Sequence, residues 1–336
     1  MTIRSKESPV APSEMVSARA TVSSYVSTLR YLTWERVGLP AVILVAMALF
    51  AVLSPRFLTL SNLTNIGRQI SVIALASWGQ SLVIFSAGID LSVGAVVALV
   101  SVVMGLVFRG AGPFLGILAG LMVGSLVGFF NGLIAGKTKI TPFIVTLASL
   151  SIVRGMAMTI TSGVPIWGFP DSNVYQVGNG YYLGIPIPMY VAALGFAFTW
   201  FLLHLTPFGI RLYALGGNEE AAILAGVNTP RSKVAIYTLS GLLAGVGGVV
   251  LTLRVQSGQP LLGTGLELQT IAAVVVGGAS LFGGKGRIVG TLLGVILIGV
   301  LNNGLDIVGV SSFIQQIVIG MAILVAVWFT TQRGRR

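Results

Sequence analysis

Residues 110–136 read GAGPFLGILAGLMVGSLVGFFNGLIAG, and no residue in this stretch carries a charge. A helix needs about 20 mostly apolar residues to cross the hydrocarbon core of a bilayer. The stretch is long enough to do so, and its glycines would let a neighbouring helix approach closely, as helices do in lipid. It therefore predicts a membrane-spanning helix.

The end of this stretch, GLIAGKT at 132–138, resembles the end of a phosphate-binding loop. Such a loop reads G-x-x-x-x-G-K-[ST] and follows a buried strand of a soluble domain. Here Asn131 stands in place of the first glycine, and an apolar run precedes the motif instead of a short strand. We interpret it as a helix end, so that any ATP used is hydrolysed by a partner.

The composition of the whole chain agrees with a membrane protein. Its 336 residues are 55% apolar with a mean hydropathy of +0.95, and only 9% are charged, whereas a soluble domain has about 25%. The 44 glycines suit closely packed membrane helices, and the absence of cysteine excludes disulfides and thiolate chemistry. Of the 20 basic residues behind the net charge of +11, five precede the first apolar run and three close the chain, so that no groove-sized basic face remains for nucleic acid.

The two ends of the chain are polar. Residues 1–37 lack the apolar core of a signal peptide, so we expect a cytoplasmic tail. Val22, Val26 and Leu29 share a helical face, which favours either a helix lying on the membrane surface or, equally, a disordered tail. Residues 332–336 form a basic C-terminal tail, and the transmembrane domain occupies 38–331.

Apolar runs across that domain predict an all-α polytopic membrane protein with about ten transmembrane helices. Lysine and arginine favour the cytoplasmic side, and an even number of spans with both termini in the cytoplasm places most of them there. The segment 162–187, which has no basic residue, then lies outside. The expected spans are 38–54, 63–86, 90–108, 113–135, 141–161, 188–205, 233–253, 267–282, 288–303 and 313–331.

The chain also contains an internal similarity. FFNGL at 129–133 matches LNNGL at 301–305, and each ends a glycine-rich span. In the expected topology the first copy runs inward and the second outward. An inverted repeat of this kind is typical of transporters, which place the substrate path at the repeat interface.

No enzyme site is visible in the sequence. His204 is the only histidine, so a histidine pair for metal binding or proton transfer is excluded. The serines have no partner base. We therefore expect a non-enzymatic chain that binds neither metal nor cofactor.

A few polar residues lie where the sequence should be apolar. Asp90 in GIDLSVG (88–94) and Glu267 in GTGLELQT (263–270) either face a path or a structural partner, because a buried carboxylate is costly in a bilayer, or lie at wet span ends. The asparagines either line the path or join helices through hydrogen bonds. The candidate path residues are Asp90, Ser92, Asn131, Glu267, Gln269, Asn302 and Asn303.

The polar segment 213–233 reads YALGGNEEAAILAGVNTPRSK and is expected on the cytoplasmic side. Asn218 is suited to cap a helix, Glu219 and Glu220 favour the positive end of its dipole, and Gly226 is suited to end it. Such a helix, with alanines on one face, either docks into a partner or is a solvated connector.

Several stretches together resemble one family. The chain is similar to the membrane permease subunits of ribose-type ABC sugar importers, from about residue 38 to the end. The resemblance is carried by GIDLSVGA (88–95), YALGGNEEAAILAGVN (213–228), QSGQPLLGTGLEL (256–268), IAAVVVGGASLFGGKGRIVGTLLG (271–294) and LNNGLDIVGVSSFIQQIV (301–318).

This resemblance implies a multi-pass protein of a bacterial inner membrane that moves a sugar inward by alternating access. It implies a second permease subunit, most simply a second copy, a cytoplasmic ABC ATPase that binds ATP and magnesium, and a periplasmic or extracellular sugar-binding protein. The segment 213–228 resembles the coupling segment of the family. The implied ATPase contacts are Gly217, Asn218, Glu219, Glu220, Ala221, Ala222 and Gly226.

One residue departs from the family pattern. Gln269 stands where relatives usually carry aspartate, after Glu267 and Leu268, so the sugar stays open between ribose, another pentose, a hexose, a polyol and a signalling sugar. An ion-coupled secondary transporter is the main alternative, and it would need no ATPase. A permease for branched-chain amino acids shares the DLSVG motif but lacks the combination of GGKGRIVGTLLG with LNNGL.

Overall fold

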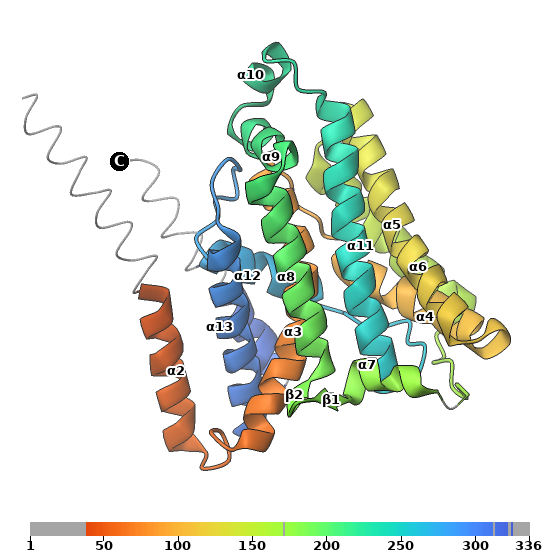
Figure 1. Cartoon of the computed structure of the whole chain (residues 1–336), viewed down its shortest axis with the longest axis vertical. Coiled ribbons are helices and arrows are strands. Elements are labelled where there is room, and N and C mark those ends of the chain that lie inside the picture. The colour runs from red at the N-terminus through yellow and green to blue at the C-terminus, as the bar shows by residue number, and fades with distance from the viewer. Residues whose placement is uncertain (1–37, 171, 312, 322–323, 325–336) are drawn as a thin grey trace, which may run out of the picture.

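The computed structural model describes residues 38–170, 172–311, 313–321 and 324. The surface helix predicted around Val22 and Leu29 and the basic C-terminal tail lie outside the described residues. The described part is a bundle of helices, and its strands are the two-residue β1 (Tyr181–Tyr182) and β2 (Ile185–Pro186), which pair antiparallel (Figure 1).

Between residues 38 and 311, apart from residue 171, nine apolar helices form the bundle, and short elements lie at its two ends. The nine are α2 (Leu39–Leu53), α3 (Leu60–Phe85), α4 (Val93–Ala111), α5 (Pro113–Lys137), α6 (Pro142–Thr161), α8 (Ile187–Leu205), α11 (Thr229–Val255), α12 (Leu266–Val276) and α13 (Ile288–Ile307). The short elements are η2 (Asn173–Tyr175), α7 (Gln176–Asn179), α9 (Pro207–Gly217) and α10 (Glu219–Leu224).

Six of these helices, α4, α5, α6, α8, α11 and α13, are long and apolar enough to cross a membrane. The helices follow the first nine predicted spans within a few residues, except that the span predicted at 267–282 ends at Val276, and part of the tenth, 313–331, lies outside the described residues. The Gly277-Gly278 pair follows directly, and Gly278 has a positive φ of 94°, which breaks the helix. The chain is therefore mostly helical with several membrane-length spans.

The core lies between α3, α4 and α11. Trp78 of α3 and Tyr237 of α11 are each 1% exposed, and most of α4 is buried between its neighbours. Helices α5 and α6 instead leave large apolar side chains exposed, among them Phe114 and Ile152. An apolar outer surface of this kind suits contact with lipid or with another membrane subunit.

Helices α5 and α11 pack against each other with their backbones in close contact. On α5, a glycine stands at every fourth position and faces the neighbouring helices: Gly116, Gly120, Gly124, Gly128, Gly132 and Gly136. A Cβ on Gly128 would collide with the carbonyl oxygen of Tyr237, and one on Gly124 would come within 2.6 Å of the carbonyl oxygen of Gly241. The glycine-rich stretch thus produces the close helix contact that small residues allow in lipid.

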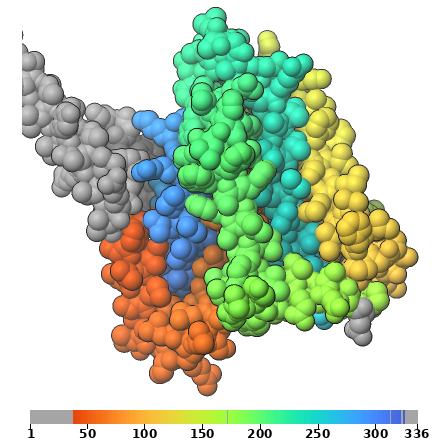
Figure 2. Space-filling view, viewed as in Figure 1, coloured from red at the N-terminus to blue at the C-terminus, as the bar shows by residue number. Residues whose placement is uncertain are grey.

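The two ends of the bundle differ. Helices α9 and α10 stand out from one end, at the top of Figures 1 and 2, beside the first turns of α11. The β1–β2 pair, α7 and the turn between α2 and α3 lie at the opposite end. Functional elements are therefore distributed between two ends and the interior.

Candidate functional site

Helix α10 is a short capped helix at the projecting end. The Oδ1 atom of Asn218 accepts a hydrogen bond from the backbone N–H of Ala221 at 2.9 Å. The helix ends before Gly226, whose φ of +84° allows the chain to turn away. The predicted cap and stop of this segment are confirmed, and a separate helix, α9, precedes them.

The side chains of α10 point mostly away from the bundle. Leu224 is 89% exposed and Ile223 is 53% exposed, which is unusual for residues that face only water. Ala222, by contrast, is 4% exposed and packs on the chain itself. We define the coupling surface as Glu219, Glu220, Ala221, Ile223 and Leu224, all of which are exposed.

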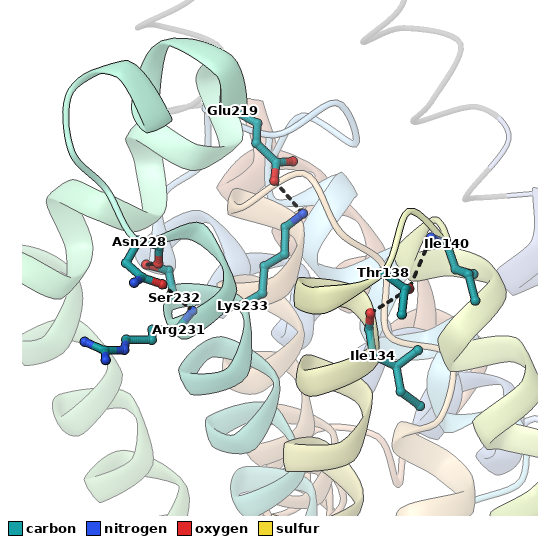
Figure 3. A network of polar contacts seen from close by, with 8 residues as sticks. All are labelled: Ile134, Thr138, Ile140, Glu219, Asn228, Arg231, Ser232 and Lys233. Carbon is teal, nitrogen blue, oxygen red and sulfur yellow. Dashed lines mark hydrogen bonds and ion pairs between the residues drawn. The ribbon is translucent and has the colours of Figure 1, made fainter.

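Polar contacts fasten this surface to α11 (Figure 3). The Nζ atom of Lys233 donates to Oε1 of Glu219 at 2.7 Å. Asn228 caps α11 by accepting a hydrogen bond from the N–H of Arg231 at 3.1 Å.

The GKT sequence at 136–138 lies at the end of α5. The hydroxyl of Thr138 donates a hydrogen bond to the carbonyl of Ile134 at 2.8 Å, as expected in the last turn of a helix.

Three backbone segments meet beneath α10. The N–H of Gly284 donates to the carbonyl of Phe85 at 3.0 Å, and a Cβ on Gly216 would collide with that carbonyl. The hydroxyl of Tyr213 donates to the carbonyl of Gly286 at 3.0 Å. Burial raises the pKa of Tyr213 to about 12, so this hydroxyl stays protonated at neutral pH. The junction links α9 to the end of α3 and to the loop before α13.

Asp90 lies in the break between α3 and α4 and is 1% exposed. Its Oδ1 accepts from the N–H of Ser92 at 3.0 Å and from the hydroxyl of Ser92 at 2.6 Å. Its Oδ2 accepts from the hydroxyl of Ser240 on α11 at 2.9 Å. The amide of Asn131 on α5 donates to the hydroxyl of Ser92 at 2.9 Å. Asp90, Ser92 and Asn131 therefore form one buried network that joins three helices.

Glu267 begins α12 and lies against the first turn of α4. Its Oε2 atom is buried without a hydrogen-bond partner among the described residues, and a Cβ on Gly94 would collide with it. Arg154 of α6 donates to the carbonyls of Pro260 and Leu262 at 3.1 and 3.0 Å, which fixes the loop before α12. The two motifs that carry Asp90 and Glu267 thus meet where α4 and α12 begin.

Gln269 and Asn302 lie on the wall of a cavity of about 300 Å³ between α3, α11, α12 and α13. The amide of Asn302 donates to Oε1 of Gln269 at 3.2 Å, while its own Oδ1 atom is buried without a partner among the described residues. The polar side chains of the wall are Gln69, Arg254, Thr264, Gln269, Asn302, Asp306 and Gln315.

Asn303, the neighbour of Asn302, faces away from that cavity. Its amide and the amide of Asn62 exchange two hydrogen bonds, of 2.9 and 3.1 Å, and join α13 to the start of α3. On the other side of Asn62 lies a second hollow of about 400 Å³, lined by Arg56 and Arg68. Arg68 donates to the hydroxyl of Tyr181 and lies over its ring.

The structure separates the seven candidate path residues. Asp90, Ser92 and Asn131 form the buried network, Gln269 and Asn302 line the cavity, Glu267 packs on α4, and Asn303 joins two helices. The sequence reasoning missed Gln69, Arg254, Asp306 and Gln315 on the cavity wall. Polar residues near the ends of predicted spans were the available signal, but span ends are expected to be polar in any membrane protein.

Comparison with known proteins identifies the family. The profile of a family described as "Branched-chain amino acid transport system / permease component" matches residues 62–327, which is most of the chain. The chain belongs to this permease family. The matched residues begin in α3. They include the buried network around Asp90, the cavity lined by Gln269 and Asn302, and the coupling surface.

Three relatives of this chain are sugar permeases by name. A ribose import permease protein of Bacillus subtilis is 48% identical over 84% of this chain and 88% of its own length. The ribose import permease protein of Escherichia coli K12 is 44% identical over 90% and 96%. A D-allose transport system permease protein of the same organism is 38% identical over 88% and 91%. No solved structure matches the chain. The family resemblance stated from the sequence is confirmed.

Proposed function

We propose that this chain is the membrane permease subunit of an ATP-driven importer for ribose or a closely related monosaccharide. The observation that carries the proposal is the 48% identity, over most of both chains, to a protein named as a ribose import permease. The membrane-length apolar helices and the polar cavity between them support transport rather than catalysis. A bacterial inner membrane is the proposed location.

The proposed topology has ten spans, both termini in the cytoplasm, and an inverted repeat. Helix α5 packs along α11 as α13 packs along α3, and α4 packs against α11 as α12 does against α3. This correspondence supports the repeat suggested by FFNGL and LNNGL. Arg231 and Lys233 lie beside α10 (Figure 3), and Lys137 is the last residue of α5, which supports a cytoplasmic location for that end by the positive-inside rule.

The coupling surface is the proposed docking site for a cytoplasmic ABC ATPase, which would bind the ATP and magnesium. An exposed leucine and isoleucine beside two glutamates provide an apolar contact with a charged rim, as protein interfaces commonly do. Gly216 and Gly284 contact the carbonyl of Phe85 at the end of α3. A movement of the ATPase would be transmitted through this contact to the break between α3 and α4. A second copy of the chain and a sugar-binding protein on the outer side would complete the importer.

The test is copurification with the ATPase and uptake of D-ribose by the reconstituted importer. We expect Leu224→Asp to lower both at least tenfold, because a carboxylate would be buried in the interface. Leu183→Asp is the matched control, since Leu183 is 83% exposed at the opposite end of the bundle and should tolerate the change. Glu219 is a less suitable site, because its replacement would also break the ion pair with Lys233.

Two results would count against this proposal. Normal copurification and uptake for Leu224→Asp would show that α10 does not dock to the ATPase. Recovery of the wild-type chain alone, with uptake driven by an ion gradient and without ATP, would show a secondary transporter instead.

A further inference from the structure

The hollow of about 400 Å³ lies at the end of the bundle opposite α10, beside the turn between α2 and α3 and the strand β1 (Figure 1). Its volume is within the range of small-molecule sites. Its lining has two cations and several neutral donors but no carboxylate, so the space is suited to an anion. We call it the arginine hollow, and its polar lining includes Arg56, Thr59, Ser61, Asn65, Arg68 and Tyr181.

The two arginines have no acidic partner among the described residues. Arg56 is exposed, and its side chain makes neither a hydrogen bond nor an ion pair there. Arg68 donates to the hydroxyl of Tyr181, a phenol and not a carboxylate, and lies 5.0 Å from the centre of its ring. In the part of the chain that the structure describes, the one ion pair joins Lys233 to Glu219 beside α10. Both positive charges of the arginine hollow are therefore uncompensated.

Neutral donors surround the arginines. The side chains of Ser61 and Asn65 make no hydrogen bond with the described residues, so both are free to donate. The hydroxyl of Tyr181 accepts from Arg68, which leaves its own proton available. Phosphate oxygens accept several hydrogen bonds at once, and a guanidinium binds them through two parallel N–H groups. A phosphate therefore uses this set of donors more fully than a smaller anion would.

Apolar side chains flank the arginine hollow. Leu58 and Leu60 stand on either side of Thr59 and are 54% and 78% exposed, and α2 exposes Val52 and Leu53 just before the turn. Because the hollow lies where α2 ends and α3 begins, it is at the depth of the phospholipid headgroups in the proposed topology. A ligand with a phosphate head and acyl chains would contact both surfaces, whereas a soluble anion would contact only the polar one.

The charge of the lining also discriminates between headgroups. A zwitterionic headgroup would bring an ammonium group close to two guanidiniums, with no carboxylate in the lining to bind it. A glycerol headgroup has the charge of its phosphate alone, and its hydroxyls can accept from Ser61 and Asn65. The lining therefore favours phosphatidylglycerol over phosphatidylethanolamine or phosphatidylcholine.

We propose that the arginine hollow binds the phosphate of an anionic phospholipid, with Arg56 and Arg68 neutralising its charge. The assignment goes beyond the proposed function, since this lipid is a resident partner and not a transported solute. The proposed topology places the lipid in the outer leaflet. Because Arg68 also contacts β1 through Tyr181, a bound lipid would fasten the turn after α2, the start of α3 and β1 to one another.

The test is native mass spectrometry of the purified full-length permease, titrated with dioleoylphosphatidylglycerol and, separately, with dioleoylphosphatidylcholine. We expect the wild type to bind the glycerol lipid more tightly. Each arginine near a membrane surface contributes enough for about a fivefold change in affinity, so Arg56→Gln should weaken binding about fivefold and the double variant with Arg68→Gln about 25-fold. Binding of phosphatidylcholine should not change.

The matched control is Arg109→Gln. Arg109 is an exposed arginine in the last turn of α4 and is not part of the lining. Its replacement removes the same charge, and affinity for the glycerol lipid should stay at the wild-type value. Arg56 has no side-chain partner among the described residues, so Arg56→Gln is expected to fold, and its melting temperature without added lipid checks this.

Three results would overturn the assignment: equal affinity for the two lipids, unchanged affinity in Arg56→Gln, or an equal loss in Arg109→Gln. Millimolar inorganic phosphate distinguishes a lipid from a soluble anion, because it should not displace the glycerol lipid. Displacement would show a site for soluble phosphate instead. Unchanged lipid affinity in Arg56→Gln, with loss of ATPase stimulation by the sugar-binding protein, would assign the hollow to a protein partner. The lipid measurement requires no transport, so it can fail or succeed independently of the proposed function.

Discussion

Helices α5 and α13 carry the two copies of the Asn-Gly-Leu motif, and their surroundings differ. The asparagine of the first copy, Asn131, is 3% exposed and bonded to Ser92 within a tightly packed region. In the second copy, Asn303 joins α13 to α3, while its neighbour Asn302 bonds to Gln269 on the wall of a cavity. Related sequence motifs therefore support a closed helix contact in one half and a hollow in the other.

The difference follows from the spacing of glycine. On α5 a glycine recurs at every fourth position, so that one face of the helix lies against α4 at Gly116 and Gly120 and against α11 from Gly124 to Gly136. On α13 the glycines stand at 290, 294, 299 and 304 and face α12, α3 and α2 in turn. Because the contacts of α13 are divided among several helices, a space remains between these helices. Polar side chains line that space. The first half is therefore closely packed, and the second half contains a hollow.

The largest expected effect is in the closed half, for Gly128→Ala. The new Cβ would collide with the backbone carbonyl of Tyr237, which cannot move without shifting α11. Overpacking of this kind costs about 3 kcal/mol or more. We expect a large loss of folded protein in the membrane and of melting temperature in detergent.

The control for this variant is Gly155→Ala on α6, because a Cβ there would meet nothing within 4 Å. Alanine favours a helix over glycine by about 1 kcal/mol, so this variant should match or exceed the wild type. Equal stability of Gly128→Ala and Gly155→Ala would show that α5 and α11 can move apart without loss of stability. The close packing of the first half would then not distinguish it from the second.

The second prediction concerns the buried network of the same half. Asp90→Ala removes the acceptor of three hydrogen bonds and leaves the hydroxyl of Ser240 without its partner. Hydrogen bonds to a charged group contribute about 1.5–3 kcal/mol, so a loss of about 2–3 kcal/mol is expected in detergent unfolding. Asp90→Asn keeps one acceptor oxygen and should lose less.

Should Asp90→Ala melt at the wild-type temperature, the network would not be a structural link. Transport by that variant then becomes the informative measurement, because a stable protein that no longer moves sugar would place Asp90 on the path instead.

The sequence was sufficient for the helices and insufficient for the arrangement of their polar residues. Long apolar runs, the cap at Asn218 and the stop at Gly226 are local features, so the spans and α10 could be predicted within a few residues. The repeated glycine of α5, at intervals of four, was also a readable signal for a close helix contact.

The cavity could not be predicted, because it depends on which way a side chain turns in a bundle. Gln69, Arg254 and Asp306 are far apart in sequence and converge only when α3, α11 and α13 pack. Asn302 and Asn303 are adjacent but point to different neighbours, one to Gln269 and one to Asn62. A residue list from sequence therefore does not separate the residues that join helices from those that line the cavity.

The smallest predicted effect measures that separation directly. Asn62 and Asn303 exchange two amide hydrogen bonds, and double-mutant cycles for hydrogen bonds within membrane proteins average about 0.6 kcal/mol. We expect Asn62→Ala and Asn303→Ala to show a coupling energy of that order in detergent unfolding, with ribose uptake retained. Asn302→Ala combined with Asn62→Ala should be additive, since Asn302 bonds to Gln269 instead. Two results would contradict this separation: strong coupling of Asn302 to Asn62, or loss of uptake in Asn303→Ala alone. Either would mean that the two asparagines act on one site, and not one between α13 and α3 and the other on the cavity wall.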